Sequence, residues 1–229
     1  TERKQAEEAL RESEALYIEA QRVAHIGHWD LDISTGVPKW SEEIFRIFGL
    51  DPGQGEPSFE AHQKITHPND WDLLNHAVTT ASTQGVPFDV DFRLLRPDKS
   101  IRWMKAAGQP VRDREGRIVR VFGTVQDITE RKRTEEALRE SEVRFRELFN
   151  RMSSGVAVYE AIDNGGDFIF RDFNPAAEKI EKVSRKDILG KRVSEAFPGV
   201  KAFGVFEVFQ RVWQTAKTEY YPENIYEDE

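Results

Sequence analysis

The sequence contains no cysteine among its 229 residues. This absence excludes disulfide bonds, thiolate metal sites, cysteine nucleophiles and photochemistry that forms a bond to a thiol. The sequence also lacks any apolar run of about eighteen residues, so no segment is predicted to span a membrane. Thr1 does not begin a signal peptide. We therefore expect a cytoplasmic chain without membrane contact.

Basic residues are also fewer than acidic ones. Lysine and arginine number 33 against 41 acidic residues, for a net charge of -8. Such a chain repels phosphate backbones, so we expect no nucleic-acid partner. With 38% hydrophobic residues, the chain has enough apolar material for about two modest domains with separate cores.

Motifs of common catalytic sites are absent as well. The sequence has no G-x-S-x-G elbow and no G-x-x-x-x-G-K phosphate loop, and the pair Gly53 and Gly55 lacks the third glycine of a dinucleotide site. We therefore expect that this chain has no catalytic activity of its own.

What the sequence does contain is a repeat. Residues 1–14 read TERKQAEEALRESE, and residues 129–142 read TERKRTEEALRESE. The distance in sequence between the two copies is too long for the repeat of a solenoid, and it suits whole domains joined by charged helices. We expect connector helices at residues 1–22 and 130–152, and a parent protein that continues upstream with another such domain.

The connector helices carry apolar residues at heptad spacing, which are Leu10, Tyr17 and Ala24 in the first and Leu138, Phe145 and Met152 in the second. Ser141 interrupts the second series. Two interpretations stay open. The helices pair in a homodimer as weak coiled coils, or they are solvated connectors that lean on their own domain.

The segment after the first connector alternates between strand and helix patterns. Period-two apolar alternation predicts strands at residues 29–33 and 88–94, further strands are expected at 37–40 and 101–106, and a nearly continuous apolar run predicts one at 118–128. Helices are predicted between Ser41 and Gly49, over residues 59–65, and from Pro68 to Gly85. These elements predict an α+β domain with one five-stranded antiparallel sheet and short helices on one face.

Three phrases of this domain carry a family resemblance, namely H-P-N-D from His67, R-P-D-x-S-I-R-W from Arg96, and G-T-V-Q-D-I-T-E-R-K from Gly123. Together with the order of elements, they resemble a PAS domain with its C-terminal motif, over about residues 24–132, and we assign residues 23–129 to it. Lys99 departs from the family, because such domains usually place glycine at this point of the turn.

Residues 153–229 resemble a second PAS domain. Strands are predicted at 156–162 and 168–173 and helices at 174–182 and 205–217, and the phrases L-G-K from Leu189 and F-P from Phe197 resemble the middle of PAS domains. No segment matches the three closing strands of the first copy. We therefore expect a truncated copy with an unpaired strand edge.

The resemblance implies a sensory and relay fragment of a multi-domain sensor histidine kinase, with a downstream kinase or other output domain as its partner. No histidine is followed by glutamate, so the phosphoacceptor itself is not expected here. Two alternatives remain: a dimerisation scaffold without ligand, and the regulatory fragment of a cyclic-dinucleotide enzyme.

The resemblance also implies a ligand pocket between the sheet and the helices. We predict that its apolar lining includes Phe45, Phe48, Ile65, Leu74, Phe92, Trp103, Phe122 and Val125. A filled core is the alternative. The D-I-T ending implies a relay in which Asp127, Thr129 and Arg131 tie the last strand to the next helix. Alternatively, Asp127 merely caps that helix.

Histidines are the remaining candidates for holding a cofactor. His25 and His28 lack a third ligand, so we expect no metal site. His67 is explained by its place beside Pro68 at a helix start. His76 lies on the helix that follows and is a candidate haem ligand. The pattern favours no cofactor, with haem on His76 as the alternative.

Overall fold

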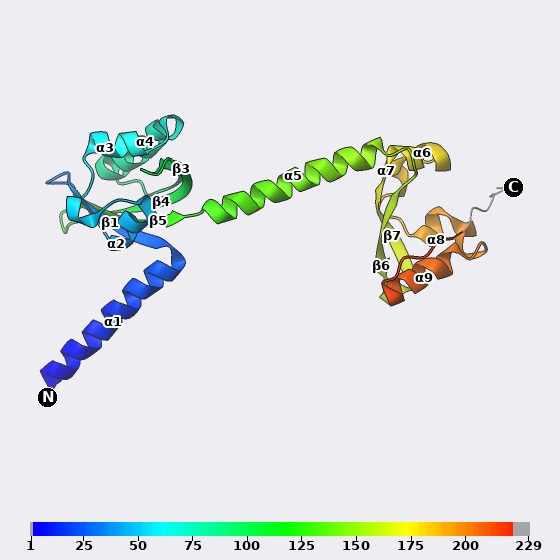
Figure 1. Ribbon diagram of the computed structural model, residues 1–229, viewed down its shortest axis with the longest axis horizontal. Coiled ribbons are helices and arrows are strands. Elements are labelled where there is room, and N and C mark those ends of the chain that lie inside the picture. The colour runs from blue at the N-terminus through cyan, green and yellow to red at the C-terminus, as the bar shows by residue number, and fades with distance from the viewer. Residues whose placement is uncertain (1, 222–229) are drawn as a thin grey trace. The chain divides into compact units, whose positions relative to one another are not determined.

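The computed structural model describes residues 2–221, and the chain divides between Ala137 and Leu138 into two compact units (Figure 1). Each unit has its own cluster of buried apolar side chains. Among the helices of the described part, none is both long and apolar enough to cross a membrane.

The first unit is built on one five-stranded sheet. Its strands are β1 (Ile26–Asp32), β2 (Pro38–Trp40), β3 (Phe88–Leu95), β4 (Ile101–Arg112) and β5 (Ile118–Asp127). They lie in the order β2-β1-β5-β4-β3, and every neighbouring pair is antiparallel. The predicted five-stranded antiparallel sheet is confirmed. The strand β4 is twice as long as its short apolar pattern indicated, because its second half pairs with β5 as far as Arg112.

The helices of this unit are α1 (Glu2–Ala24), α2 (Glu42–Phe48), α3 (Phe59–Ile65), α4 (Pro68–Gln84) and the start of α5 (Thr129–Arg151), with a short 3₁₀ turn η1 (Pro52–Gln54). Gly49 and Gly85 end α2 and α4 in the left-handed conformation, with φ values of 72° and 71°. Ser41 does not cap α2 with its side chain. Its hydroxyl instead accepts the His28 N–H at 3.0 Å and joins α2 to β1.

The strands present alternate side chains to opposite faces of the sheet. On β4, Met104 and Ala106 are buried in the core, whereas Trp103 and Lys105 point to the other face. Helices α3 and α4 lie over the inner face (Figure 1), and α2 and α4 pack on the sheet there. The sheet therefore has one face turned to a helical layer and one face available to other elements.

The H-P-N-D phrase fixes the start of α4. The Nδ1 atom of His67 accepts the N–H of Asn69 at 3.2 Å, so this histidine caps its helix. The Asp70 carboxylate accepts two hydrogen bonds from the Arg93 guanidinium, at 2.7 and 2.8 Å, and a third from the backbone N–H of Arg93. These contacts lower the pKa of Asp70 and hold α4 against β3.

The second unit contains a two-stranded antiparallel sheet of β6 (Ala157–Ile162) and β7 (Asp167–Phe173), joined by the turn η2 (Asp163–Gly165). Its helical elements are α6 (Pro175–Glu181), α7 (Arg185–Ile188), α8 (Val193–Ala196), η3 (Pro198–Lys201) and α9 (Val205–Thr215). Asn174 caps α6, as its side chain accepts the Ala177 N–H at 2.9 Å. The two strands fit the predicted truncation.

The edges of this small sheet differ. The free edge of β7 is partly covered, because Phe170 exchanges backbone hydrogen bonds with Gly190 and Lys191. The other edge of β6 has no strand partner within residues 2–221. In the first unit, the corresponding edge of β1 pairs with β5.

Lys99 keeps the turn between β3 and β4 by adopting a left-handed conformation, with φ at 67°. The turn between β4 and β5 has the same hydrogen-bond pattern with Gly116 at that position, at φ 82°. We expect Lys99→Gly to raise the free energy of unfolding by about 0.5–1 kcal/mol, because it relieves the strain of a side chain at positive φ.

The reciprocal change, Gly116→Lys, should lower that free energy by about 1 kcal/mol, since a Cβ at Gly116 meets no neighbouring atom and only backbone strain is added. Urea unfolding of both variants measures the two effects. Equal responses to the two changes would contradict the strain argument.

Candidate functional site

An apolar cavity of about 200 Å³ lies inside the first unit, between the inner face of the sheet and the helices. The sheet contributes residues such as Phe92, Ala106 and Val125, and the helical side contributes Phe48 and Leu74. Gly36 and Pro38 of the β1–β2 hairpin and Pro57 also line it. The cavity is therefore lined from both the sheet and the helical side of the domain.

His62 on α3 lies in an aromatic cluster at this cavity. Its ring centroid is 5.7 Å from that of Trp40, 6.1 Å from that of Trp71 and 6.3 Å from that of Phe48. All four residues line the cavity. Sequence patterns do not identify His62, Trp40 or Trp71 as residues of the pocket. Near a turn or a helix start, the apolar pattern is too short to indicate which side chains face a cavity.

Burial lowers the pKa of His62 to about 4. The imidazole is consequently neutral at pH 7, with one nitrogen as donor and the other as acceptor. Within the described part of the chain, no residue forms a hydrogen bond to this ring. His62 is thus a polar group in an apolar wall.

Four of the eight predicted pocket residues line the cavity, namely Phe48, Leu74, Phe92 and Val125. Two others lie in the surrounding core without reaching the cavity. Phe45 is buried, with its ring 5.4 Å from that of Trp40, and Ile65 packs against the buried cluster.

Trp103 and Phe122 were wrongly placed in the pocket. Both point to the outer face of the sheet, because their positions on β4 and β5 alternate with the inward-facing Met104 and Val121. The Trp103 ring lies beneath the Arg93 guanidinium at 5.4 Å. Phe122 is 37% exposed, with its ring 6.2 Å from that of His28.

His76 is exposed on α4 and does not line the cavity, so the structure contradicts its placement as a haem ligand there. The volume also argues against such a group, because about 200 Å³ lies below the roughly 300–1,000 Å³ of pockets for drug-sized ligands, and a haem or a flavin is larger still. Within residues 2–221, no cluster of three or more metal-ligating side chains occurs.

The junction of β5 and α5 brings two of the predicted relay residues together. Asp127 accepts the Thr129 N–H at 2.9 Å. The buried Thr129 hydroxyl accepts the Trp103 N–H at 2.9 Å, and the Ile128 N–H donates to the Trp103 carbonyl at 2.9 Å. The first residues of α5 are therefore hydrogen-bonded directly to β4.

Arg131, the third predicted relay residue, does not join this junction. It pairs with Glu135 at 3.9 Å on the exposed side of α5. The arginine nearest to Asp127 is Arg102 on β4, at 3.8 Å. A guanidinium on the neighbouring strand, rather than the one in the D-I-T-E-R phrase, therefore pairs with this carboxylate.

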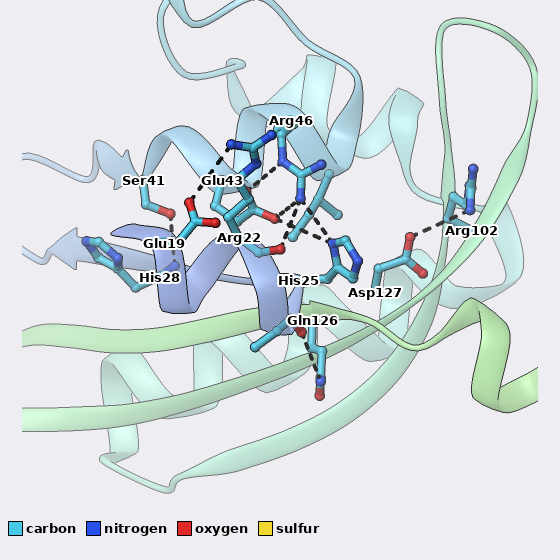
Figure 2. A network of polar contacts seen from close by, with 12 residues as sticks. Glu19, Arg22, His25, His28, Ser41, Glu43, Arg46, Arg102, Gln126 and Asp127 are labelled. Carbon is cyan, nitrogen blue, oxygen red and sulfur yellow. Dashed lines mark hydrogen bonds and ion pairs between the residues drawn. The ribbon is translucent and has the colours of Figure 1, made fainter. Parts of the chain in front are cut away.

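Figure 2 shows that the start of the domain meets its end. His25, which joins α1 to β1 with φ at 52°, accepts the Asp127 N–H through its carbonyl at 3.2 Å. Its ring nitrogen lies 3.0 Å from the Arg46 guanidinium, which also binds the buried Glu43 at 2.7 Å. Through these contacts α1, α2 and β5 share one polar network.

The second unit has its own depression of about 590 Å³, lined by residues of β6, β7 and the helical segments. Among these, the rings of Tyr159 and Phe209 lie 4.9 Å apart and those of Phe170 and Phe197 lie 5.7 Å apart. Only two strands form its sheet wall, whereas five strands form the sheet of the first unit.

The partly buried His62 makes stability depend on pH. The unfolded chain binds a proton at this residue near pH 6.5, but the folded chain does so only near pH 4. The folded state should therefore lose stability as the pH falls from about 6.5 to about 4. Each pKa unit is worth about 1.4 kcal/mol, so the total loss reaches about 3 kcal/mol. Replacing His62 with glutamine removes this contribution.

Urea unfolding of the native chain and of His62→Gln at about pH 7 and about pH 4.5 measures the difference. Contributions from the carboxylates are common to both proteins and cancel in the comparison. An identical pH dependence in the two chains would show that His62 keeps an ordinary affinity for protons.

Comparisons with known proteins agree with this architecture. Residues 37–125 match the family model described as PAS fold, and residues 153–225 match the one described as PAS domain. A crystal structure of a sensory box histidine kinase/response regulator from Burkholderia thailandensis is 27% identical, with a TM-score of 0.47, over 58% of this chain and 98% of that one.

Two curated relatives are sensor kinases or sensor proteins by name. Sensor protein FixL of Bradyrhizobium diazoefficiens is 30% identical over 76% of this chain and 33% of its own length. The blue-light-activated histidine kinase of Brucella anthropi is 28% identical over 69% of this chain and 33% of its own length. The chain thus spans about a third of each. With both of its units matched, the chain belongs to the PAS family and carries two PAS domains.

Proposed function

We propose that this chain is the sensory and signal-relay part of a larger signal-transduction protein, in which the cavity of the first PAS domain receives a small molecule. One observation carries this proposal: β4 contributes Ala106 to the cavity wall and, three residues earlier, holds the start of α5 through Trp103. A change in the curvature of β4 on filling the cavity then moves the first turn of α5.

A second set of contacts strengthens this coupling. Lys132, in the first turn of α5, lies 5.2 Å above the Trp103 ring and 2.8 Å from the Asp91 carboxylate on β3. Cation–π and ionic contacts at partly exposed sites are each worth about 0.5–1 kcal/mol. The helix start is therefore attached to two strands of the sheet and follows their movement.

For the output, we propose a histidine kinase encoded in the same protein, with the PAS domains in the cytoplasm, where a kinase finds ATP. The relation to FixL and to a blue-light-activated histidine kinase supports it. A second candidate output is a diguanylate cyclase, because the probable diguanylate cyclase DgcE of Escherichia coli is 25% identical over 75% of this chain. In either case, we assign no catalytic step to these two domains.

The connector helices support a homodimer. Leu10 and Tyr17 on α1 are 61% and 54% exposed, and Leu138 and Phe145 on α5 are 60% and 52% exposed. Large apolar side chains at heptad spacing stay in water in the single chain, and pairing of the helices would bury them. Movement of α5 would then change the register or the crossing of the pair. If neither cavity binds a ligand, this dimer is the whole function.

Filling the cavity by mutation tests the proposed input without a ligand. Ala106→Leu from the sheet and Val78→Leu from α4 each place extra methyl groups in the empty volume. We expect both to change the catalytic rate of the output domain in the whole protein in the same direction. Amide hydrogen exchange at Glu130 and Lys132 should change as well. If two folded variants leave both measurements unchanged, the cavity is not the input.

Breaking the junction tests the relay. Asp127→Ala removes the acceptor for the Thr129 N–H and the partner of Arg102. It should cost only about 1 kcal/mol of stability, yet return the output of the Ala106→Leu protein to the native rate. Arg131→Ala is the matched control, because its pair with Glu135 is exposed, and it should leave the effect of Ala106→Leu intact. An Asp127→Ala protein that still transmits the effect would show that this aspartate only caps α5.

A further inference from the structure

The cavity wall of the first unit has an unusual composition. Eighteen residues line it, none of them aspartate, glutamate, lysine or arginine. Eight of them have aromatic rings, including three of the five tryptophans of the chain. A wall without charge cannot offset the cost of desolvating an ionised ligand, so the occupant is neutral. Flat ring faces on several sides favour a planar occupant.

Only two lining side chains other than tryptophan carry hydrogen-bonding atoms, and these are His62 and Asn75. The His62 imidazole stands among the rings of Trp40, Phe48 and Trp71, and no described residue bonds to it. The His62 ring is only partly buried, and its nitrogens are not among the buried unpaired polar atoms of the described residues, so they can bond to water. A ligand that displaces this water has to supply a hydrogen bond to the imidazole in its place, which favours a ligand with a hydrogen-bonding group.

The volume limits the size of the occupant. An engineered cavity of about 150 Å³ binds benzene, and this cavity measures about 200 Å³. The extra space accommodates one or two small substituents on a single ring. The β1–β2 hairpin contributes Gly36 and Pro38 to the wall, the segment before α3 contributes Pro57, and α3 begins with Phe59, which lines the cavity although it is 63% exposed.

We propose that the first PAS domain binds a neutral monocyclic aromatic molecule with one hydrogen-bonding substituent, of which a small phenol is the simplest example, and that His62 bonds to this substituent. The inference rests on the proposed sensory function and specifies its ligand class. His62 is a ligand-binding residue in this scheme, and the surrounding rings provide the shape.

Three probes of similar shape test the ligand class on the native chain. They are 4-methylphenol, p-xylene, in which a methyl group replaces the hydroxyl, and 4-methylbenzoate, which carries a charge. Titration calorimetry and the fluorescence of the three wall tryptophans report binding. We expect 4-methylphenol to bind about tenfold more tightly than p-xylene, the effect of one buried hydrogen bond, and 4-methylbenzoate not to bind.

Variants then test the role of His62. His62→Phe keeps a ring but removes both nitrogens, so the two neutral probes should bind equally. His62→Gln keeps a donor and an acceptor and should retain a preference for the phenol. The control is His76→Phe, since His76 is an exposed histidine outside the cavity, and it should behave as the native chain.

Each result has one meaning. Equal binding of the two neutral probes to the native chain, or binding of none of them, overturns the ligand class. A phenol preference that survives His62→Phe overturns the role of His62. Neither result touches the sensory function itself, which depends on whether Ala106→Leu and Val78→Leu change the output.

Discussion

The hydrogen bonds between Trp103 and the start of α5 are the constraint on which the first domain depends. The Trp103 N–H donates a hydrogen bond to the Thr129 hydroxyl, and the Trp103 carbonyl accepts one from the Ile128 N–H. In a sheet, these backbone groups of Trp103 would be satisfied by another residue of the neighbouring strand. Here the strand ends and a helix begins, so the helix takes the place of the next strand residue. The position of α5 is consequently an extension of the sheet.

This arrangement is useful because neighbouring residues of a strand face opposite sides. Ala106 and Met104 face the cavity and the core, while Trp103 and Lys105 face outward, where α5 starts. The backbone between them is one pleated strand, and it is the route that we propose for the relay from the cavity to α5. The same helix is anchored again in the second unit, where Asn174 donates to the Phe149 carbonyl at 3.1 Å and Arg146 pairs with Asp172.

Local patterns predicted most of the architecture correctly, and the site only in part. Strands, caps and turns follow from residues near in sequence, so the five-stranded sheet and the helix ends at Gly49 and Gly85 were predictable. Trp103 and Phe122 were misplaced because aromatic residues occur on both faces of β4 and β5, and hydrophobicity alone does not identify the inner face. His62 was missed because a seven-residue helix shows too few turns to indicate which side is buried.

The sequence by itself determined the repeat, the order of elements, the lack of any thiol and the turn positions, since each depends on a residue type or on contacts along the chain. Only the tertiary structure decided which histidine reaches the cavity, that Arg102 rather than Arg131 lies beside Asp127, and that His25 bonds to the far end of its domain. These contacts join residues distant in the chain. Their partners are selected by the strand order of the folded sheet, which no local pattern encodes.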